Sequence, residues 1–166
     1  MKKINILVID PSPIIQIGFK TLFKSSSKFE LIECIDSIYD FNEFIKSSNI
    51  DIIITELKLV DGEANDILKS IRLMSKEIPV LVFTNKSQKL HAIDILKNGA
   101  IGYLSKNSKK RKIKETLEKI ALQNFNFIET NSFTRLKNNF NKDYNKIKMD
   151  SLSKREIQVL KLFIKG

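Results

Sequence analysis

The sequence predicts an α/β fold built on a doubly wound parallel sheet of five strands. Five short apolar runs alternate with segments of helical periodicity, the rhythm of a parallel sheet whose strands are joined by helices. The first run, residues 4–9, is apolar almost without a break, as in a parallel strand that helices cover on both faces. Four of the five runs lead into a side chain able to carry chemistry, and such folds bind ligands at the carboxyl ends of their strands.

The five strands are expected where apolar residues follow one another with little polar interruption. The first run ends at Asp10, and Pro79 stands directly before the fourth. Runs of this length suit strands better than helices. The expected strands are residues 4–9, 29–35, 52–54, 80–83 and 101–104.

Each strand is followed by a segment in which apolar side chains recur at helical spacing. Pro13 stands near the start of the first helix, where proline is favoured, and Gly99 is placed to end the fourth. The residues that mark the five helices are, in order, Ile14, Ile15, Phe19, Leu22 and Phe23; Phe41, Phe44 and Ile45; Ile67, Leu68, Ile71 and Met74; Leu90, Ile93 and Leu96; and Ile113, Leu117, Ile120 and Ala121.

Polar side chains stand at the carboxyl ends of four expected strands. Asp10 and Glu56 follow the first and third strands, and Thr84 and Lys106 follow the fourth and fifth. Because the carboxyl ends of parallel strands meet at one edge of the sheet, these four side chains should converge in one crevice. The sequence therefore predicts a functional site made of two carboxylates, a hydroxyl and an ammonium group.

The periodicity fails after the fifth helix. We expect residues 1–123 to form the α/β domain, residues 124–150 a linker, and residues 151–166 the first helix of a truncated all-α domain. Ser153 is a candidate N-cap with Glu156 three residues later, the capping-box arrangement. The linker is rich enough in phenylalanine that part of it is expected to dock on a neighbouring surface. A single amphipathic helix has nothing of its own to pack against, so we expect the chain to be a fragment.

The net charge of +10 is concentrated in the C-terminal part of the chain. Residues 1–108 hold 14 Lys and Arg against 13 Asp and Glu, whereas residues 109–166 hold 15 against 6. A basic segment attracts nucleic acid through its phosphates. The alternative is codon usage, because Lys, Asn and Ile are all abundant, as an AT-rich genome encodes them. Charge alone does not separate these two explanations.

Several features favour a cytoplasmic protein. Cys34 is the only cysteine, which excludes an internal disulfide and suits a reducing compartment. No apolar run approaches the roughly 20 residues of a membrane helix. The basic start is followed too soon by Asp10, Pro11 and Pro13 for an export signal. We therefore expect no membrane association.

Five motifs together resemble bacterial two-component response regulators. Residues 82–84, Val-Phe-Thr, stand between longer stretches that resemble receiver-domain landmarks, and residues 99–106 look most like the NarL/FixJ group. Residues 152–160, with Lys165 and Gly166, resemble the opening of a LuxR-type helix-turn-helix. The resemblance covers residues 1–123, implying a (βα)5 flavodoxin-like receiver, and resumes at 151. The quoted stretches are Ile6-Leu-Val-Ile-Asp10-Pro-Ser-Pro13, Ile54-Thr-Glu56-Leu-Lys-Leu, Gly99-Ala-Ile-Gly-Tyr-Leu-Ser-Lys106 and Leu152-Ser-Lys-Arg-Glu-Ile-Gln-Val-Leu160.

The chain departs from the family pattern on one side of the expected pocket. The family has two adjacent acidic residues after the first strand, where this chain has Asp10 and Pro11. The family's phosphoacceptor is an aspartate, and the matching position here is Glu56. The loop at residues 59–62 is also about two residues shorter than usual. Thr84 and Lys106 match the pattern, as does Tyr103, which in the family changes rotamer as the threonine shifts; a half-buried strand tyrosine is the alternative.

These departures imply weakened phosphorylation chemistry. In the family a divalent cation held by the acidic cluster neutralises the phosphoryl group, so the lack of a carboxylate at Pro11 leaves at most a weak Mg²⁺ site at Asp10 and Glu56, and we expect no other cofactor. Glu56 is one methylene longer than aspartate, and a misplacement of about 1 Å can cost on the order of 100-fold in rate. Phosphotransfer to Glu56 is therefore not expected.

Two hypotheses for Glu56 remain open. In the first, its carboxylate is a fixed, partial mimic of a phosphorylated aspartate that reaches Lys106 and Thr84; it is incomplete because a phosphoryl group carries nearly two charges. In the second, Glu56 and Lys106 form a structural ion pair in a pocket that no longer switches.

The resemblance implies a transcriptional regulator, not an enzyme, that forms a homodimer and answers to a sensor kinase or another protein partner. DNA would be bound through the missing C-terminal domain, with no DNA-reading residue inside this chain. The rival functions are a pseudo-receiver used as an interaction or dimerisation module, and a doubly wound enzyme or flavin binder. The last is disfavoured because Pro11-Ser12-Pro13 stands where a Gly-rich phosphate loop would follow the first strand.

Three further features have ordinary interpretations. His91 has no second histidine or cysteine nearby, so a solvated side chain is favoured over a metal ligand. The basic residues 109–112 could touch DNA or a partner, although a solvated helix start is the simpler interpretation. Residues 25–27, all serine, are expected to form the exit from the first helix.

Overall fold

A computed structural model describes residues 2–86, 95–96, 98–122 and 127–128 of the 166-residue chain. Its strands are β1 (Ile4–Ile9), β2 (Phe29–Ile35), β3 (Ile52–Thr55), β4 (Val80–Thr84), β5 (Gly102–Ser105) and β6 (Phe127–Ile128). Its helices are α1 (Pro13–Phe23), α2 (Ile38–Ser47), α3 (Ala64–Leu73) and α5 (Lys110–Ala121). Ile95 and Leu96 are also helical, and Gly99 follows them with φ of +105°, a conformation suited to glycine. The rest of the predicted fourth helix lies outside the described residues.

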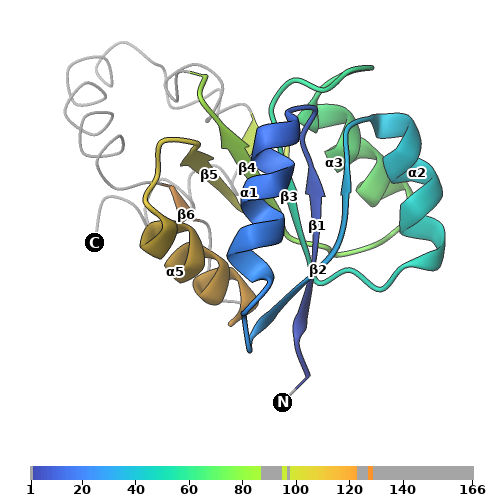
Figure 1. The fold of residues 1–166 in the computed structure, drawn as a ribbon. Coiled ribbons are helices and arrows are strands. Elements are labelled where there is room, and N and C mark those ends of the chain that lie inside the picture. The colour runs from blue at the N-terminus through green and yellow to red at the C-terminus, as the bar shows by residue number, and fades with distance from the viewer. Residues whose placement is uncertain (1, 87–94, 97, 123–126, 129–166) are drawn as a thin grey trace, which may run out of the picture. The chain divides into compact units, whose positions relative to one another are not determined.

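The strands form one sheet in the order β2-β1-β3-β4-β5-β6, and every neighbouring pair is parallel. The order reverses at β1, from which the chain adds β2 on one side and β3 on the other (Figure 1). The predicted doubly wound α/β fold and its five parallel strands are therefore confirmed.

The sheet also has a sixth strand that the sequence did not predict. Two residues, Phe127 and Ile128, pair with Gly102 and Tyr103 of β5, inside the stretch expected to be a linker. A two-residue strand is too short to show periodicity, and its pairing depends on the free edge of β5, which local sequence does not reveal. The other linker residues and the predicted helix at 151–166 lie outside the described residues.

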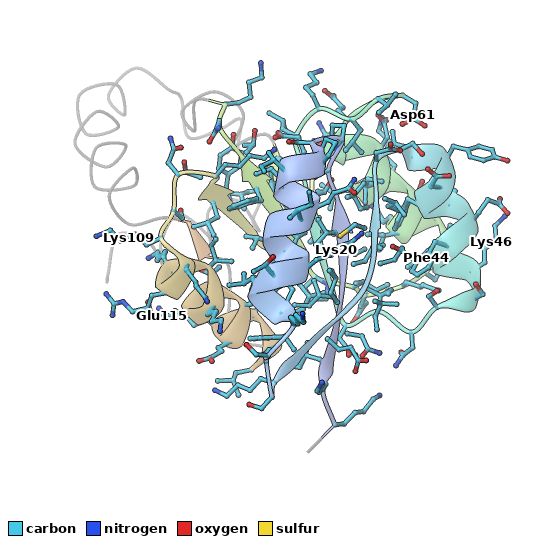
Figure 2. All side chains as sticks on the ribbon, in the orientation of Figure 1. Lys20, Phe44, Lys46, Asp61, Lys109 and Glu115 are labelled. Atoms are coloured by element: carbon cyan, nitrogen blue, oxygen red, sulfur yellow. The ribbon has the colours of Figure 1, made fainter. Side chains whose placement is uncertain are left out.

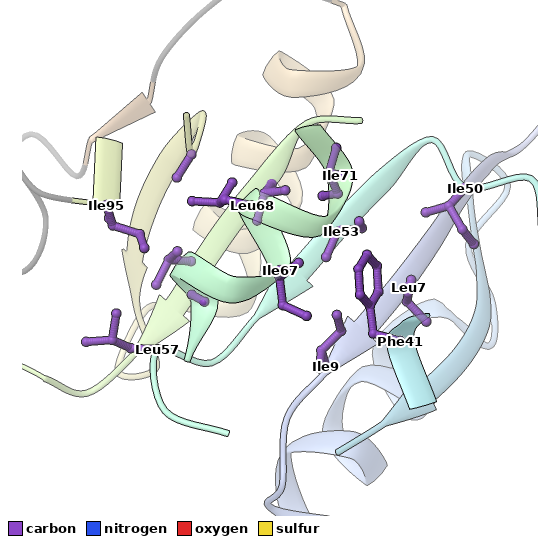
Figure 3. Packing of buried hydrophobic residues seen from close by; sticks show 14 of the residues in the cluster. Leu7, Ile9, Phe41, Ile50, Ile53, Leu57, Ile67, Leu68, Ile71 and Ile95 are labelled. Atoms are coloured by element: carbon purple, nitrogen blue, oxygen red, sulfur yellow. The ribbon is translucent and has the colours of Figure 1, made fainter. Parts of the chain in front are cut away.

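Alternating side chains of the strands point to opposite faces of the sheet and pack into two separate hydrophobic cores. Leu7 and Ile9 of β1 face a core with α2 and α3, which Figure 3 shows from close by. Ile6 and Val8 face the opposite core, which holds α1 and α5. The strands β3 and β4 are buried along their whole length and are almost wholly apolar, which is why they could be predicted. This packing holds the carboxyl ends of β1, β3, β4 and β5 at one edge of the sheet.

The loop between β3 and α3 is tied to the start of α2 by Asp61. Its carboxylate oxygens accept hydrogen bonds from the backbone N–H groups of Ile38 (2.7 Å) and Tyr39 (2.9 Å). Figure 2 shows Asp61 beside the first turn of α2. These N–H groups have no partner within the helix, so the carboxylate caps α2 from a distant loop. The bonds, that from Ile38 above all, lower the pKa of Asp61 below its usual value.

The described helices have no membrane-crossing segment, since none of them is both long and apolar enough.

Candidate functional site

Backbone hydrogen bonds carry the sheet one residue beyond the strand ends and so place the site residues. The N–H of Glu56 donates to the carbonyl of Ile9 (2.8 Å), and the N–H of Lys106 donates to the carbonyl of Thr84 (3.1 Å). Glu56 and Lys106 are therefore held in register with the strands beside them. Asp10 directly follows β1, so the predicted residues meet at one edge, as the sequence indicated.

At the centre of the site, one ammonium group bridges two carboxylates. Lys106 Nζ lies 2.7 Å from Asp10 Oδ2 and 2.6 Å from Glu56 Oε2. The side chains are largely buried, with exposed fractions of 2% for Asp10, 11% for Lys106 and 13% for Glu56. Ion pairs in such surroundings are screened little by salt, so the three charged groups act as one unit.

The remaining carboxylate oxygens are bound by backbone N–H groups. Asp10 Oδ1 accepts from the N–H of Ser12 (2.9 Å), and Glu56 Oε1 accepts from the N–H of Leu57 (2.6 Å). All four oxygens of the two carboxylates therefore have a protein partner. These charge-assisted bonds fix both carboxylates in place and offset part of the cost of burying them.

The pKa of Lys106 reflects a competition between burial and its two partners. Burial lowers the pKa of the ammonium group, but the hydrogen bonds and charges of Asp10 and Glu56 outweigh it, so the pKa is raised above its usual value. Lys106 therefore stays protonated throughout the physiological pH range.

Thr84 ends β4 and Tyr103 lies on β5, and both side chains are hydrogen-bonded to the backbone of Lys86, just after β4. The Thr84 hydroxyl accepts from the N–H of Lys86 (3.2 Å), and the Tyr103 hydroxyl donates to the carbonyl of Lys86 (3.4 Å). The Tyr103 side chain is buried. Burial, and then the charge of Glu56, raises its pKa to about 12. In the described part of the chain no hydrogen bond joins Thr84 to Glu56.

The donor set does not fit a resident divalent cation. Mg²⁺ needs near-octahedral oxygen ligands and usually takes one or two carboxylates with several waters. Here both available carboxylates already hold Lys106, and Pro11 offers no side-chain oxygen at the next position. Within the described residues, no group of three or more His, Cys, Asp or Glu side chains is arranged to hold a metal ion.

Sequence reasoning missed two contacts that hold Asp10 in place. Ser12 contributes a backbone N–H, and Gln16 Nε2 donates to the backbone carbonyl of Asp10 (2.8 Å). The turn formed by Asp10, Pro11 and Ser12 carried a signal for the first contact, because an aspartate before such a turn often accepts an N–H two residues on. The Gln16 contact had no comparable signal.

The structure describes some of the residues that the sequence singled out outside the pocket. His91 lies outside the described residues. Lys109, Lys110 and Arg111 are exposed at the start of α5, and Arg111 pairs with Glu115 at 3.1 Å. Figure 2 shows Lys109 and Glu115 on the outside of this helix. A solvated helix start accounts for these side chains.

Comparison with known proteins identifies the family. The family model described as the response regulator receiver domain matches residues 6–118. The chain belongs to this family. The resemblance to a receiver domain, which the stretches at residues 6–13, 54–59, 82–84 and 99–106 carry, is thereby confirmed.

The relatives of this receiver include response regulators of the NarL and LuxR types. The chain is 24% identical over 166 residues to the Fimbriae Z protein of Escherichia coli, covering all of this chain and 78% of that protein. It is 26% identical over 164 residues to the nitrate/nitrite response regulator protein homolog of Haemophilus influenzae, covering 99% and 77%. Among solved structures, RcsB dimers bound to two parallel DNAs match with a TM-score of 0.75 at 18% identity, covering 99% and 78%.

Proposed function

We propose that this protein is an atypical response regulator that controls transcription and whose receiver is not switched by phosphorylation of an aspartate. The observation that carries the proposal is the ion-paired Glu56 at the position of the phosphoacceptor. Its Oε2 is held by Lys106 at 2.6 Å and its Oε1 by the N–H of Leu57 at 2.6 Å. A carboxylate bound at both oxygens and displaced by a methylene is poorly placed to attack a phosphoryl group.

Part of the contact set expected of a phosphorylation mimic is present. Glu56 engages Lys106 directly, and Tyr103 is fully buried with its hydroxyl on Lys86. Both features suit a receiver held in one fixed state by its own carboxylate. In this account Glu56 supplies permanently the negative charge that phosphorylation supplies reversibly, with one charge in place of nearly two.

A second candidate function rests on the Thr84 contact. The Thr84 hydroxyl accepts from Lys86 and forms no described hydrogen bond with Glu56. This favours a pseudo-receiver in which the ion pairs are structural and the domain serves as an interaction or dimerisation module. The two candidates differ in whether Glu56 controls assembly.

The proposed output is DNA binding by a homodimer in the cytoplasm, through a C-terminal DNA-binding domain. The RcsB structure contains dimers bound to DNA, and the chain matches 78% of that protein. The basic C-terminal segment of this chain would strengthen its attraction to DNA phosphates without recognising the base sequence. A sensor kinase or another protein would be the upstream partner, and the protein itself would not be an enzyme.

Sedimentation of the wild type beside Glu56→Ala and Glu56→Asp tests the proposal. If Glu56 holds an assembled state, Glu56→Ala should lower the fraction of dimer, and Glu56→Asp should lower it because the shorter side chain cannot hold Lys106 in the same way. A matched control is Glu43→Ala on α2, which breaks only an exposed ion pair with Lys46. Equal assembly of all four proteins would reject control by Glu56 and support the interaction module.

A further inference from the structure

The ammonium group of Lys106 lies where a cation would have to bind between Asp10 and Glu56. Its contacts of 2.7 and 2.6 Å with the two carboxylates are as short as ion-pair hydrogen bonds usually are. The side chain reaches this point from the end of β5 while the carboxylates extend from the ends of β1 and β3. The ammonium group of Lys106, a cation that belongs to the protein itself, thus already links the ends of β1, β3 and β5.

The charge in the pocket leaves little attraction for a second cation. Two carboxylates and one ammonium group sum to a single net negative charge, held in a site where each side chain is at least 87% buried. A divalent ion that entered beside Lys106 would meet ammonium repulsion at close range in a medium that screens it weakly. An ion that displaced Lys106 would have to move its long side chain away from two direct partners.

The oxygens available to such an ion are also already engaged. Asp10 Oδ1 is bound by the N–H of Ser12 and Glu56 Oε1 by the N–H of Leu57, while Lys106 holds the other two oxygens. Pro11 is exposed at the position from which a third carboxylate would reach the site, and it carries no oxygen on its side chain. A small hard cation would therefore give up water ligands without gaining a matching set from the protein.

From this geometry we infer that Lys106 is the resident cation of the pocket and that, with no third carboxylate at Pro11 to attract a second cation, it excludes divalent metal ions from the site. Accordingly, neither Mg²⁺ nor a chelator should change the stability of the folded protein through this pocket. This inference goes beyond the proposed function, because it holds whether or not Glu56 controls assembly.

Titration of the 166-residue chain with Mn²⁺, followed by electron paramagnetic resonance, tests the inference directly. Wild type should show no binding in the low millimolar range. Thermal unfolding with and without Mg²⁺ gives a second readout, since a Kd of about 1 mM would raise the folded-to-unfolded ratio about tenfold at about 10 mM Mg²⁺. Wild type should show no such change. Binding by the wild type with a Kd of about 1 mM or below would overturn the inference.

Two variants test the cause of the exclusion. Lys106→Met leaves two unneutralised carboxylates and should bind Mn²⁺ at least about tenfold more tightly than wild type. Pro11→Asp adds a third carboxylate at an exposed position while keeping Lys106, and it should also gain binding. Lys110→Met, which removes an exposed lysine of α5, is the matched control and should gain none.

The outcomes separate cleanly. A folded Lys106→Met that binds no Mn²⁺ would overturn the role of Lys106. If Lys106→Met does not fold, Pro11→Asp decides, because gain of binding supports the charge argument and absence of gain overturns it. A wild type that binds Mn²⁺ while its assembly still depends on Glu56 would overturn this inference and leave the proposed function standing.

Discussion

Replacing Lys106 with methionine should destabilise the receiver strongly, because two buried carboxylates lose their shared counter-ion. Asp10 is 2% exposed and Glu56 13% exposed, so water replaces the ammonium group poorly. Removal of one partner from a buried ion pair costs about 3–5 kcal/mol. The pocket retains some solvent contact through Glu56, so we expect a loss at the lower end, about 3 kcal/mol.

A thermodynamic cycle with Glu56→Gln isolates the part of this loss that arises from charge. Glu56→Gln alone keeps the Lys106–Asp10 pair and should cost about 1–2 kcal/mol. The double variant leaves Asp10 as the single unpaired charge, so its loss should fall short of the sum by at least about 1 kcal/mol.

Urea unfolding near neutral pH, followed by circular dichroism, measures all four proteins, and an unchanged slope with denaturant would show that only stability differs. Additive losses would refute the reasoning, because they would mean that the two side chains contribute independently. A loss below about 1 kcal/mol for Lys106→Met would refute it as well, since exposed ion pairs contribute that little.

Three further predictions concern the surroundings of the pocket. Gly62→Ala should lower stability by about 1–2 kcal/mol, because the added Cβ would meet Ile38 Cδ1 and, at 2.9 Å, Asp66 Oδ2. Gly18→Ala on the open face of α1 should instead raise stability by about 0.5–1 kcal/mol. Urea unfolding that gave both changes the same sign would contradict this. The stability of the wild type relative to Tyr103→Phe should fall by about 1.4 kcal/mol between about pH 8 and about pH 11. The pKa of Tyr103 is about 12 in the folded protein and about 10 when unfolded, so the stability that the neutral phenol contributes is complete below the unfolded pKa and is lost as the pH rises through the folded pKa. A difference in stability independent of pH would refute the burial argument. Asp61→Ala should cost on the order of 1 kcal/mol of stability near neutral pH. Because the pKa of this carboxyl is lowered in the folded protein, the stability advantage of the wild type should disappear as the pH falls below 3.8, the ordinary pKa of the group. An advantage that persisted in strong acid would contradict this.

The strands and the meeting of the site residues could be predicted because both follow from simple rules. A strand buried on both faces must be apolar along its whole length, and Ile6 to Ile9 shows that pattern without ambiguity. The carboxyl ends of parallel strands lie at one edge, so Asp10, Glu56 and Lys106 had to converge once the strands were recognised.

The partners of each oxygen could not be predicted, because they depend on tertiary geometry at the scale of one bond. No pattern in the sequence says that Lys106 contacts both carboxylates, or that Thr84 bonds to Lys86 in place of Glu56. Asp61 reads as an ordinary loop residue, yet it caps a helix that precedes it by more than twenty positions. The sixth strand was missed for the same reason, since its partner is the edge of β5.

The claim that Glu56 does not accept a phosphoryl group is tested most directly by intact-mass measurement. The chain is incubated with a small phosphodonor and Mg²⁺ beside the double variant Pro11→Asp/Glu56→Asp, which restores the carboxylates of the family pattern. The account predicts an unchanged mass for the wild type and the mass of one added phosphoryl group for the double variant. A stable phosphoryl adduct on Glu56 of the wild type would contradict it.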